Sequence, residues 1–209
     1  NLVSEQYTTQ YLIRRFTIDG LDYSSYLSAF AFSFADIRLV EDYQGIDGVT
    51  NSFAAAIWSV EIFTEFVIMG GFRMQFFNPM GSSFQSVLGE APLFGPSSLF
   101  YGLVTSILTQ HAYPDIYRPT VTANTSMNIK AYYLNYWTYL GVLILNKDTN
   151  ASASGTVSVK LSDTSGINCM HISAPSLSST TDITFAGYSW GSNSSSPTGN
   201  FTGTFLTVN

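Results

Sequence analysis

The stretch Ile37-Arg-Leu-Val-Glu-Asp-Tyr-Gln-Gly-Ile-Asp-Gly-Val-Thr-Asn-Ser-Phe-Ala-Ala-Ala-Ile-Trp58 joins an apolar run to a helical pattern through a polar turn. Residues 37–40 are mostly apolar and end in two acidic residues, which is typical of a buried strand that ends at a polar site. Thr50 or Asn51 can then cap a helix over residues 52–69, where apolar side chains recur at helical spacing. The stretch therefore predicts a strand, a loop and a helix.

A second unit of the same kind follows. Gly70 and Gly71 end the helix, residues 72–77 read as another short strand, and residues 96–110 read as a helix with proline at its start. The order strand, helix, strand, helix is typical of α/β proteins with a parallel sheet. Two such units cannot close a barrel or bury both faces of a parallel sheet, so we expect a further segment to supply the remaining strands.

After residue 119 the pattern changes to short alternating runs separated by Ser, Gly and Asn, which predicts a β-sandwich. The predicted division is residues 1–113 for the α/β part and residues 114–209 for the all-β part. The predicted strands span residues 127–133, 139–146, 156–161, 167–172, 183–185 and 201–208.

Composition excludes several classes of function. The chain has 209 residues and a net charge of −6, and its eight basic residues are scattered, which argues against nucleic-acid binding. Glu61 and Glu65 interrupt the apolar run 53–71, so we predict a buried helix there and no transmembrane span. His111 and His171 lie in different parts of the chain without acidic or cysteine neighbours at ligand spacing, so we expect no metal and no cofactor.

Four glycosylation sequons lie in the second half of the chain, where Ser and Thr are dense. They predict a secreted or cell-surface glycoprotein, or one held in a lysosome-like compartment. Cys169 is the single cysteine, so a disulfide within the chain is impossible. The acceptor residues are Asn124, Asn150, Asn193 and Asn200.

The quoted stretch resembles the seventh strand, loop and helix of the heparanase and β-glucuronidase family of glycoside hydrolases, in which an Arg stands three residues before the catalytic Glu. Residues 71–78 are similar to the eighth strand of that family, 92–108 to its last barrel helix, and 141–148 to a core strand of its C-terminal β-domain. The resemblance implies the last two strand–helix units of a (β/α)8 barrel followed by a β-sandwich.

Carried over by position, the resemblance implies that Glu41 is the nucleophile of a retaining glycosidase acting on a carbohydrate such as a glucuronide. It implies substrate contacts for Arg38, Tyr43 and Asn78, and an acid/base carboxyl on the absent segment. A carboxylate at the carboxyl end of a barrel strand lies at the face where such enzymes do chemistry. The nucleophile would be ionised, and the second carboxyl would lie about 5 Å away.

Some positions depart from the family pattern. Val40, Tyr43 and Gln44 replace a Gly, an Asn and a Ser, and Phe77 stands where the family commonly has His. An alternative interpretation is therefore a catalytically inactive relative that serves as a structural or adhesive extracellular glycoprotein. A third interpretation, a sugar-binding module, rests on aromatic residues that more often belong to a core or an interface. Those residues are Tyr132, Tyr133, Tyr136, Trp137 and Tyr139.

Overall fold

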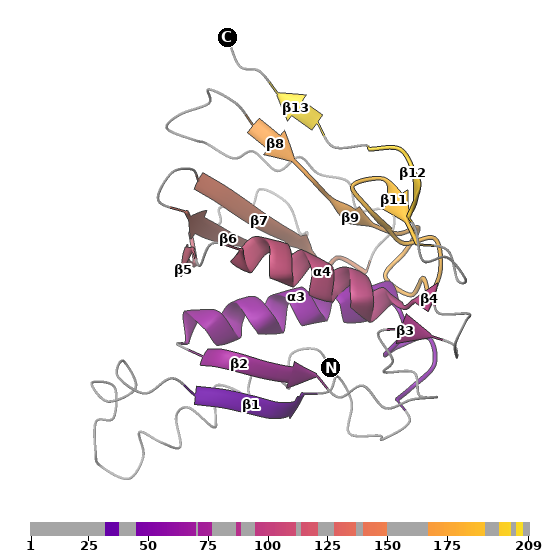
Figure 1. Cartoon of the computed structure of the whole chain (residues 1–209), viewed down its shortest axis with the longest axis horizontal. Coiled ribbons are helices and arrows are strands. Elements are labelled where there is room, and N and C mark those ends of the chain that lie inside the picture. The colour runs from indigo at the N-terminus through magenta and orange to yellow at the C-terminus, as the bar shows by residue number, and fades with distance from the viewer. Residues whose placement is uncertain are drawn as a thin grey trace.

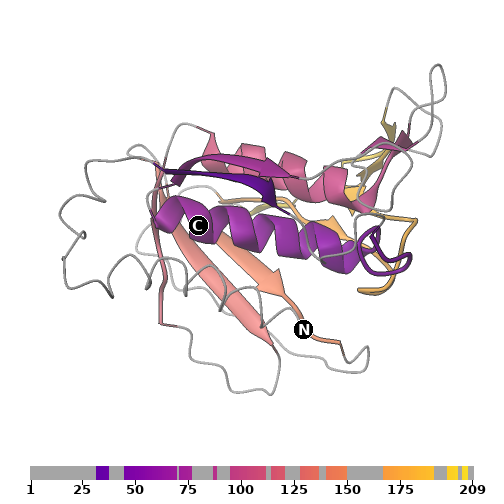
Figure 2. The same cartoon turned by 90° about the horizontal axis from the view of Figure 1, so that it is seen from below.

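A computed structural model describes residues 32–37, 45–69, 71–76, 87–88, 95–111, 114–120, 128–136, 140–149, 167–190, 197–201 and 204–206. These residues form a mixed α/β structure with a β-rich second half (Figure 1). The helices α3 and α4 pack side by side, and α3 lies between a parallel strand pair, β1–β2, and an antiparallel sheet that contains β6 and β7 (Figures 1 and 2). The mixed α/β character expected from the sequence is confirmed.

The first part of the chain alternates strands and helices in the predicted order. Strand β1 spans Phe32–Ile37, helix α3 Phe53–Ile68, strand β2 Gly71–Phe76 and helix α4 Ser98–Gln110. The strands β1 and β2 pair in parallel, with Ile37 opposite Phe76. The prediction placed the start of the first strand too late, because residues 32–36 read equally well as part of a preceding element, and the pairing with β2 is what assigns them to β1.

Local sequence explains where α3 ends. The residue after the helix, Met69, is followed by Gly70 and Gly71, as the sequence predicted. Gly71 begins β2 directly against the ring of Phe66, and a Cβ atom at residue 71 would overlap that ring. The glycine therefore allows the sharp return of the chain from α3 into β2.

The predicted caps of α3 were wrong. The residue before the helix is Ser52, with extended backbone angles, and it makes no side-chain cap hydrogen bond within the described residues. The Thr50 hydroxyl donates to the carbonyl of Ile46 at 3.0 Å, and the Asn51 carboxamide accepts from the Gly48 amide at 2.7 Å. Both side chains stabilise the preceding turn, because that turn offers them nearer partners than the helix does.

The second half consists of short antiparallel strands. In order along one sheet these are β5 (Asp115–Tyr117), β6 (Ile129–Asn135) and β7 (Leu140–Asn146). A four-stranded sheet contains β9 (Ile172–Ser173), β10 (Thr184–Phe185), β11 (Tyr188–Ser189) and β12 (Thr198–Gly199). A further pair joins β8 (Ile167–Cys169) to β13 (Thr204–Leu206). In the first part of the chain, before α4, β3 (Val87–Leu88) pairs with β4 (Gly95–Pro96).

Five of the six strands predicted in this half overlap observed strands. The predicted strand 167–172 is divided into β8 and β9, and the predicted strand 156–161 lies outside the described residues. Strand β5 lies just after the predicted boundary at residue 113, and it pairs with β6.

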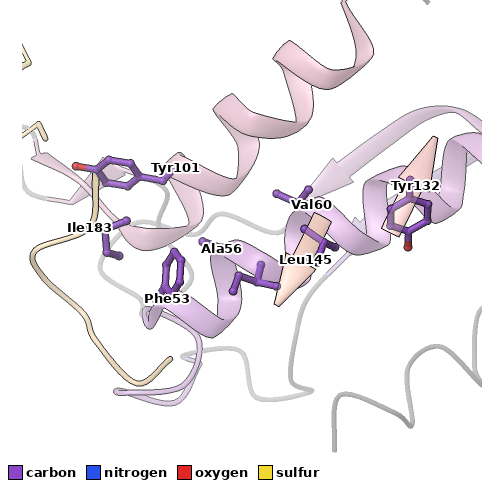
Figure 3. Packing of buried hydrophobic residues seen from close by; sticks show 8 residues of the cluster. Phe53, Ala56, Val60, Tyr101, Tyr132, Leu145 and Ile183 are labelled. Carbon is purple, nitrogen blue, oxygen red and sulfur yellow. The ribbon is translucent and has the colours of Figure 1, made fainter. Parts of the chain in front are cut away.

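One apolar cluster joins the helices to the β-rich half (Figure 3). Its members come from α3, α4, β6, β7 and the residue before β10. They are Phe53, Ala56, Ile57, Val60, Tyr101, Tyr132, Leu145 and Ile183. The cluster thus includes residues on both sides of the predicted boundary at residue 113. Trp58 is also buried, as the sequence predicted.

The two helices approach each other closely. Gly102 of α4 faces α3 and is buried, and Ser106, one turn later, is buried as well. A Cβ atom on Gly102 would lie 2.9 Å from the Cα atom of Ala56 and would also overlap the Ser59 hydroxyl. Within the described residues, neither helix is long and apolar enough to cross a membrane.

Candidate functional site

The predicted catalytic and substrate-binding residues, Arg38, Glu41, Tyr43 and Asn78, lie outside the described residues. The structure describes the strands that precede them. Because β1 and β2 are parallel and Ile37 lies opposite Phe76, the carboxyl ends of the two strands lie at the same end of the pair. In the sequence, Glu41 comes shortly after the last residue of β1, and Asn78 comes shortly after the last residue of β2.

A turn formed by residues 46–52 leads directly into α3. The amides of Val49 and Thr50 both donate to the Ile46 carbonyl, at 3.0 and 2.9 Å. The Ser52 hydroxyl donates to the Val49 carbonyl at 2.7 Å. Gly48 has a backbone φ of 73°, which residues other than glycine rarely adopt. The turn is therefore bonded to itself and continues directly into the helix.

The structure brings together a set of charged side chains that sequence reasoning did not assign to a site. We call it the charge cluster. It lies between α3 and the β5–β6–β7 sheet and consists of Glu61, Glu65, Arg118, Lys130, Tyr132 and Lys147. Both glutamates come from α3 and have side chains that are 11% exposed. The one signal in the sequence was a pair of glutamates one turn apart in an otherwise apolar helix.

Lys130 joins the two glutamates. Its Nζ lies 2.8 Å from Glu61 Oε1 and 2.6 Å from Glu65 Oε1. Lys147 Nζ approaches Glu61 Oε1 from the end of β7 at 3.1 Å. The Arg118 guanidinium binds Glu65 Oε2, and the Tyr132 hydroxyl donates to Glu65 Oε1 at 2.7 Å. Each carboxylate therefore has at least two hydrogen-bonded or ionic partners.

The surroundings of Glu65 determine its ionisation. Burial opposes the charged form, but the hydrogen bonds from Arg118, Lys130 and Tyr132 outweigh it and lower the pKa of Glu65 to about 2. Burial, followed by the hydrogen bond to Glu65, raises the pKa of the Tyr132 hydroxyl. The same carboxylate raises the pKa of Arg118. Glu65 is therefore an anion at every physiological pH.

Two neighbouring carboxylates suggest the acid and nucleophile of a glycosidase, but the charge cluster does not suit that chemistry. A general acid must carry a proton near neutral pH, and Glu65 is held in the opposite state. Its oxygens are occupied by Lys130, Arg118 and Tyr132. The cluster instead forms an ionic contact that attaches α3 to the sheet.

The structure also describes some of the aromatic residues and one of the glycosylation sites that the sequence singled out. Tyr132 and Tyr136 are buried, which confirms the core interpretation for these two of the five aromatic residues. The Tyr136 hydroxyl donates to the Thr109 carbonyl at 2.6 Å. Asn200 is exposed, whereas Asn124, Asn150 and Asn193 lie outside the described residues. In the described part of the chain, no three His, Cys, Asp or Glu side chains are grouped so as to hold a metal ion.

No protein-family model matches this chain, and no curated protein is significantly similar to it in sequence.

Proposed function

We propose that the chain is the C-terminal part of a retaining glycoside hydrolase of the heparanase and β-glucuronidase type, with Glu41 as its nucleophile. In this proposal β1, α3, β2 and α4 are the last two strand–helix units of a (β/α)8 barrel, and the β-rich half is a C-terminal β-sandwich. The observation that carries the proposal is the parallel pairing of β1 and β2 around α3, with Ile37 opposite Phe76. In barrels, catalytic residues follow the carboxyl ends of such strands.

The proposed chemistry uses two carboxyl groups. Ionised Glu41 attacks the anomeric carbon, and the glycosidic oxygen leaves with a proton from a carboxylic acid about 5 Å away. Water then hydrolyses the glycosyl-enzyme ester, with the second carboxyl acting as base. Arg38 would lower the pKa of Glu41 and keep it ionised, and Tyr43 and Asn78 would contact the sugar.

The second carboxyl would come from a partner segment that completes the barrel. Within the described ranges β1 and β2 pair only with each other, whereas parallel sheets are almost always extended and covered on both faces. Helix α4 turns Gly102 toward α3, and its Ile107 and Leu108 are 67% and 46% exposed. The β1–β2 pair, which no other described strand extends, and the exposed apolar residues of α4 both favour a partner made of further strand–helix units.

Mechanism-based labelling tests the proposal. The full protein, including the partner segment, is treated with cyclitol epoxides or aziridines of several sugar configurations. We expect one equivalent of label on the peptide that contains Glu41, and none in Glu41→Gln. The neighbouring variant Asp42→Asn is the control and should still react. Absence of label with every configuration would reject the enzyme and favour the inactive extracellular relative.

The glycosylation sequons support a location outside the cytosol. Asn200 belongs to an Asn-Phe-Thr sequon and is exposed, as an acceptor must be. We expect protein from a eukaryotic secretory host to lose mass on treatment with peptide N-glycosidase, and Asn200→Gln to lose part of that shift. An unmodified Asn200 in secreted material would contradict this assignment.

A further inference from the structure

The two helices pack side by side, but the N–H groups in their first turns have different surroundings. A helix leaves these groups without partners of its own, and they need acceptors from a cap, from water or an ion, or from another segment. At the start of α3, the Phe53 amide donates to the Ser179 carbonyl at 2.7 Å, and the Ala54 amide donates to the Leu177 carbonyl at 2.8 Å. The β-rich half therefore caps α3.

The start of α4 has no cap of this kind. Within the described ranges, no group accepts a hydrogen bond from the amides of Ser98 and Leu99. Ser97, the residue before the helix, makes no side-chain cap hydrogen bond there. The hydroxyls of Ser97 and Ser98 are buried, and neither has a hydrogen-bond partner in the part of the chain that the structure describes. Two amides and two hydroxyls are thus left without an acceptor.

These four donors lie at one end of α4. Ser97 occupies the cap position, where a side chain lies beside the first N–H groups of the helix. The Cα–Cβ bond of a helical residue tilts toward the N-terminus, so the Ser98 hydroxyl lies toward the same end. Ser97 and Ser98 are 2% and 1% exposed, and Leu99 is 4% exposed. The chain itself therefore encloses the four groups.

The start of α3 lies at the same end of the helix pair. Gly102, one turn after Ser98, faces Ala56 of α3. Phe53, the first residue of α3, and Tyr101, in the first turn of α4, belong to the same apolar cluster (Figure 3). Both helices therefore begin at the same end of the pair (Figure 1), and each contributes partial positive charge there.

We propose that the start of α4 binds a chloride ion, held by the amides of Ser98 and Leu99 and the hydroxyls of Ser97 and Ser98. Buried donors without an acceptor are unfavourable, and a water molecule has lone pairs for only two of these four donors. An anion can accept from all of them, and the N-terminus of a helix favours negative charge. The inference does not depend on the proposed glycosidase activity.

The surroundings of the four donors favour a small monovalent ion. Burial of charge is unfavourable and becomes more so as the charge increases, so one charge is favoured over the two charges of sulfate. The low exposure of Ser97 and Ser98 argues against a carboxylate side chain from a partner, because such a side chain must enter through an open surface. Chloride meets both conditions.

Urea unfolding of the full protein in sodium chloride and in sodium methanesulfonate, at equal ionic strength, tests the proposal. Methanesulfonate is also monovalent but is much larger than chloride. Chloride that binds only the folded protein lowers the unfolding equilibrium constant, by about tenfold when its concentration is about ten times its dissociation constant. We expect this decrease in wild type as chloride replaces methanesulfonate. Equal unfolding constants in the two salts would overturn the proposal and leave water as the partner.

Two serine variants of α4 form a matched pair. Ser98→Ala removes a proposed ligand, whereas Ser106→Ala removes an equally buried hydroxyl that already donates to the Gly102 carbonyl at 2.9 Å. We expect the chloride dissociation constant to rise at least about tenfold in Ser98→Ala and to stay unchanged in Ser106→Ala. The salts are compared within each variant, so a general loss of stability cancels. Equal dissociation constants in the two variants would contradict the assigned ligands.

Bromide locates the ion directly. It has the same charge as chloride and a similar radius, and its anomalous scattering marks its position in crystals of the full protein soaked in sodium bromide. We expect a peak within hydrogen-bond distance of the Ser97 and Ser98 hydroxyls in wild type, and none there in Ser98→Ala. An empty site in wild-type crystals would overturn the proposal even where the two salts differ in their effect on unfolding.

Discussion

Helix α3 has two neighbours that hold it by different means. Toward α4 it presents small residues, and the backbones approach until Gly102 has no room for a side chain. Toward the β5–β6–β7 sheet it presents Glu61 and Glu65, which bind cations from the sheet and its flanking segments. The first interface depends on shape, and the second depends on charge. Side-chain volume should therefore disrupt one, and protonation or loss of a carboxylate should disrupt the other.

Loss of Glu65 should have the largest effect. In Glu65→Ala, Lys130, Tyr132 and Arg118 lose an acceptor, and removal of one partner from a buried ion pair typically costs about 3–5 kcal/mol. We expect urea unfolding to show a loss of this size. Asp47→Ala, at an exposed site, is the control and should change the free energy of unfolding by well under about 1 kcal/mol. Equal effects of the two substitutions would contradict the role of the cluster.

Acid should weaken the same interface. The pKa of Glu65 is about 2 in the folded protein against an ordinary value of 4.5. A lowered pKa contributes stability above the unfolded value and loses it as pH falls toward the folded value. We expect wild type to lose about 3 kcal/mol relative to Glu65→Gln between pH 6 and pH 2. Parallel curves of unfolding free energy against pH would contradict the assigned pKa.

A side chain at Gly102 should disrupt the other interface. Gly102→Val places branched carbons against Ala56 and Ser59, and overpacking of this kind costs about 1–3 kcal/mol. Thermal unfolding should show a lower Tm at every pH, because no charge is involved. Ser59→Ala removes the nearest hydroxyl. The double variant Gly102→Val/Ser59→Ala should therefore have a higher Tm than Gly102→Val alone. A valine variant with an unchanged Tm would mean that the helices can separate at no cost.

Lys147 should contribute least. Glu61 keeps its contact with Lys130 when Lys147 is lost, so the carboxylate still has a cation beside it. We expect Lys147→Met to cost about 1 kcal/mol, the net contribution of one typical hydrogen bond. A loss comparable with that of Glu65→Ala would show that the cluster acts through Glu61 as strongly as through Glu65.

The sequence predicted those elements whose signals are local. Helical spacing from Phe53 to Val67 and the stop at Gly70 located α3 within one residue at its start and end. Alternation predicted a strand over residues 127–133, and the observed strand β6 begins and ends two residues later, with Tyr132 and Leu134 buried. The strands β9 to β12 have two residues each, which is too short for a periodic pattern, and their pairing could not be predicted.

The charge cluster and the cap of α3 could not be predicted for a different reason. Glu65 is separated in the sequence from Arg118 and Lys130 by several elements, and spacing does not indicate which cations reach it. The acceptors for the Phe53 and Ala54 amides are main-chain carbonyls, which every residue has. Side-chain type carries no information about such contacts, so only the fold reveals them.

The distance in sequence between Phe53 and Ser179 has a consequence for biosynthesis. A ribosome adds about 5–20 residues per second, so Ser179 is made on the order of ten seconds after Phe53. During that interval the first turn of α3 exposes its N–H groups to water, and apolar side chains such as Ile57 lack Ile183 as a neighbour. The nascent chain therefore carries an incomplete helix that chaperones can bind until the last third of the sequence has been translated.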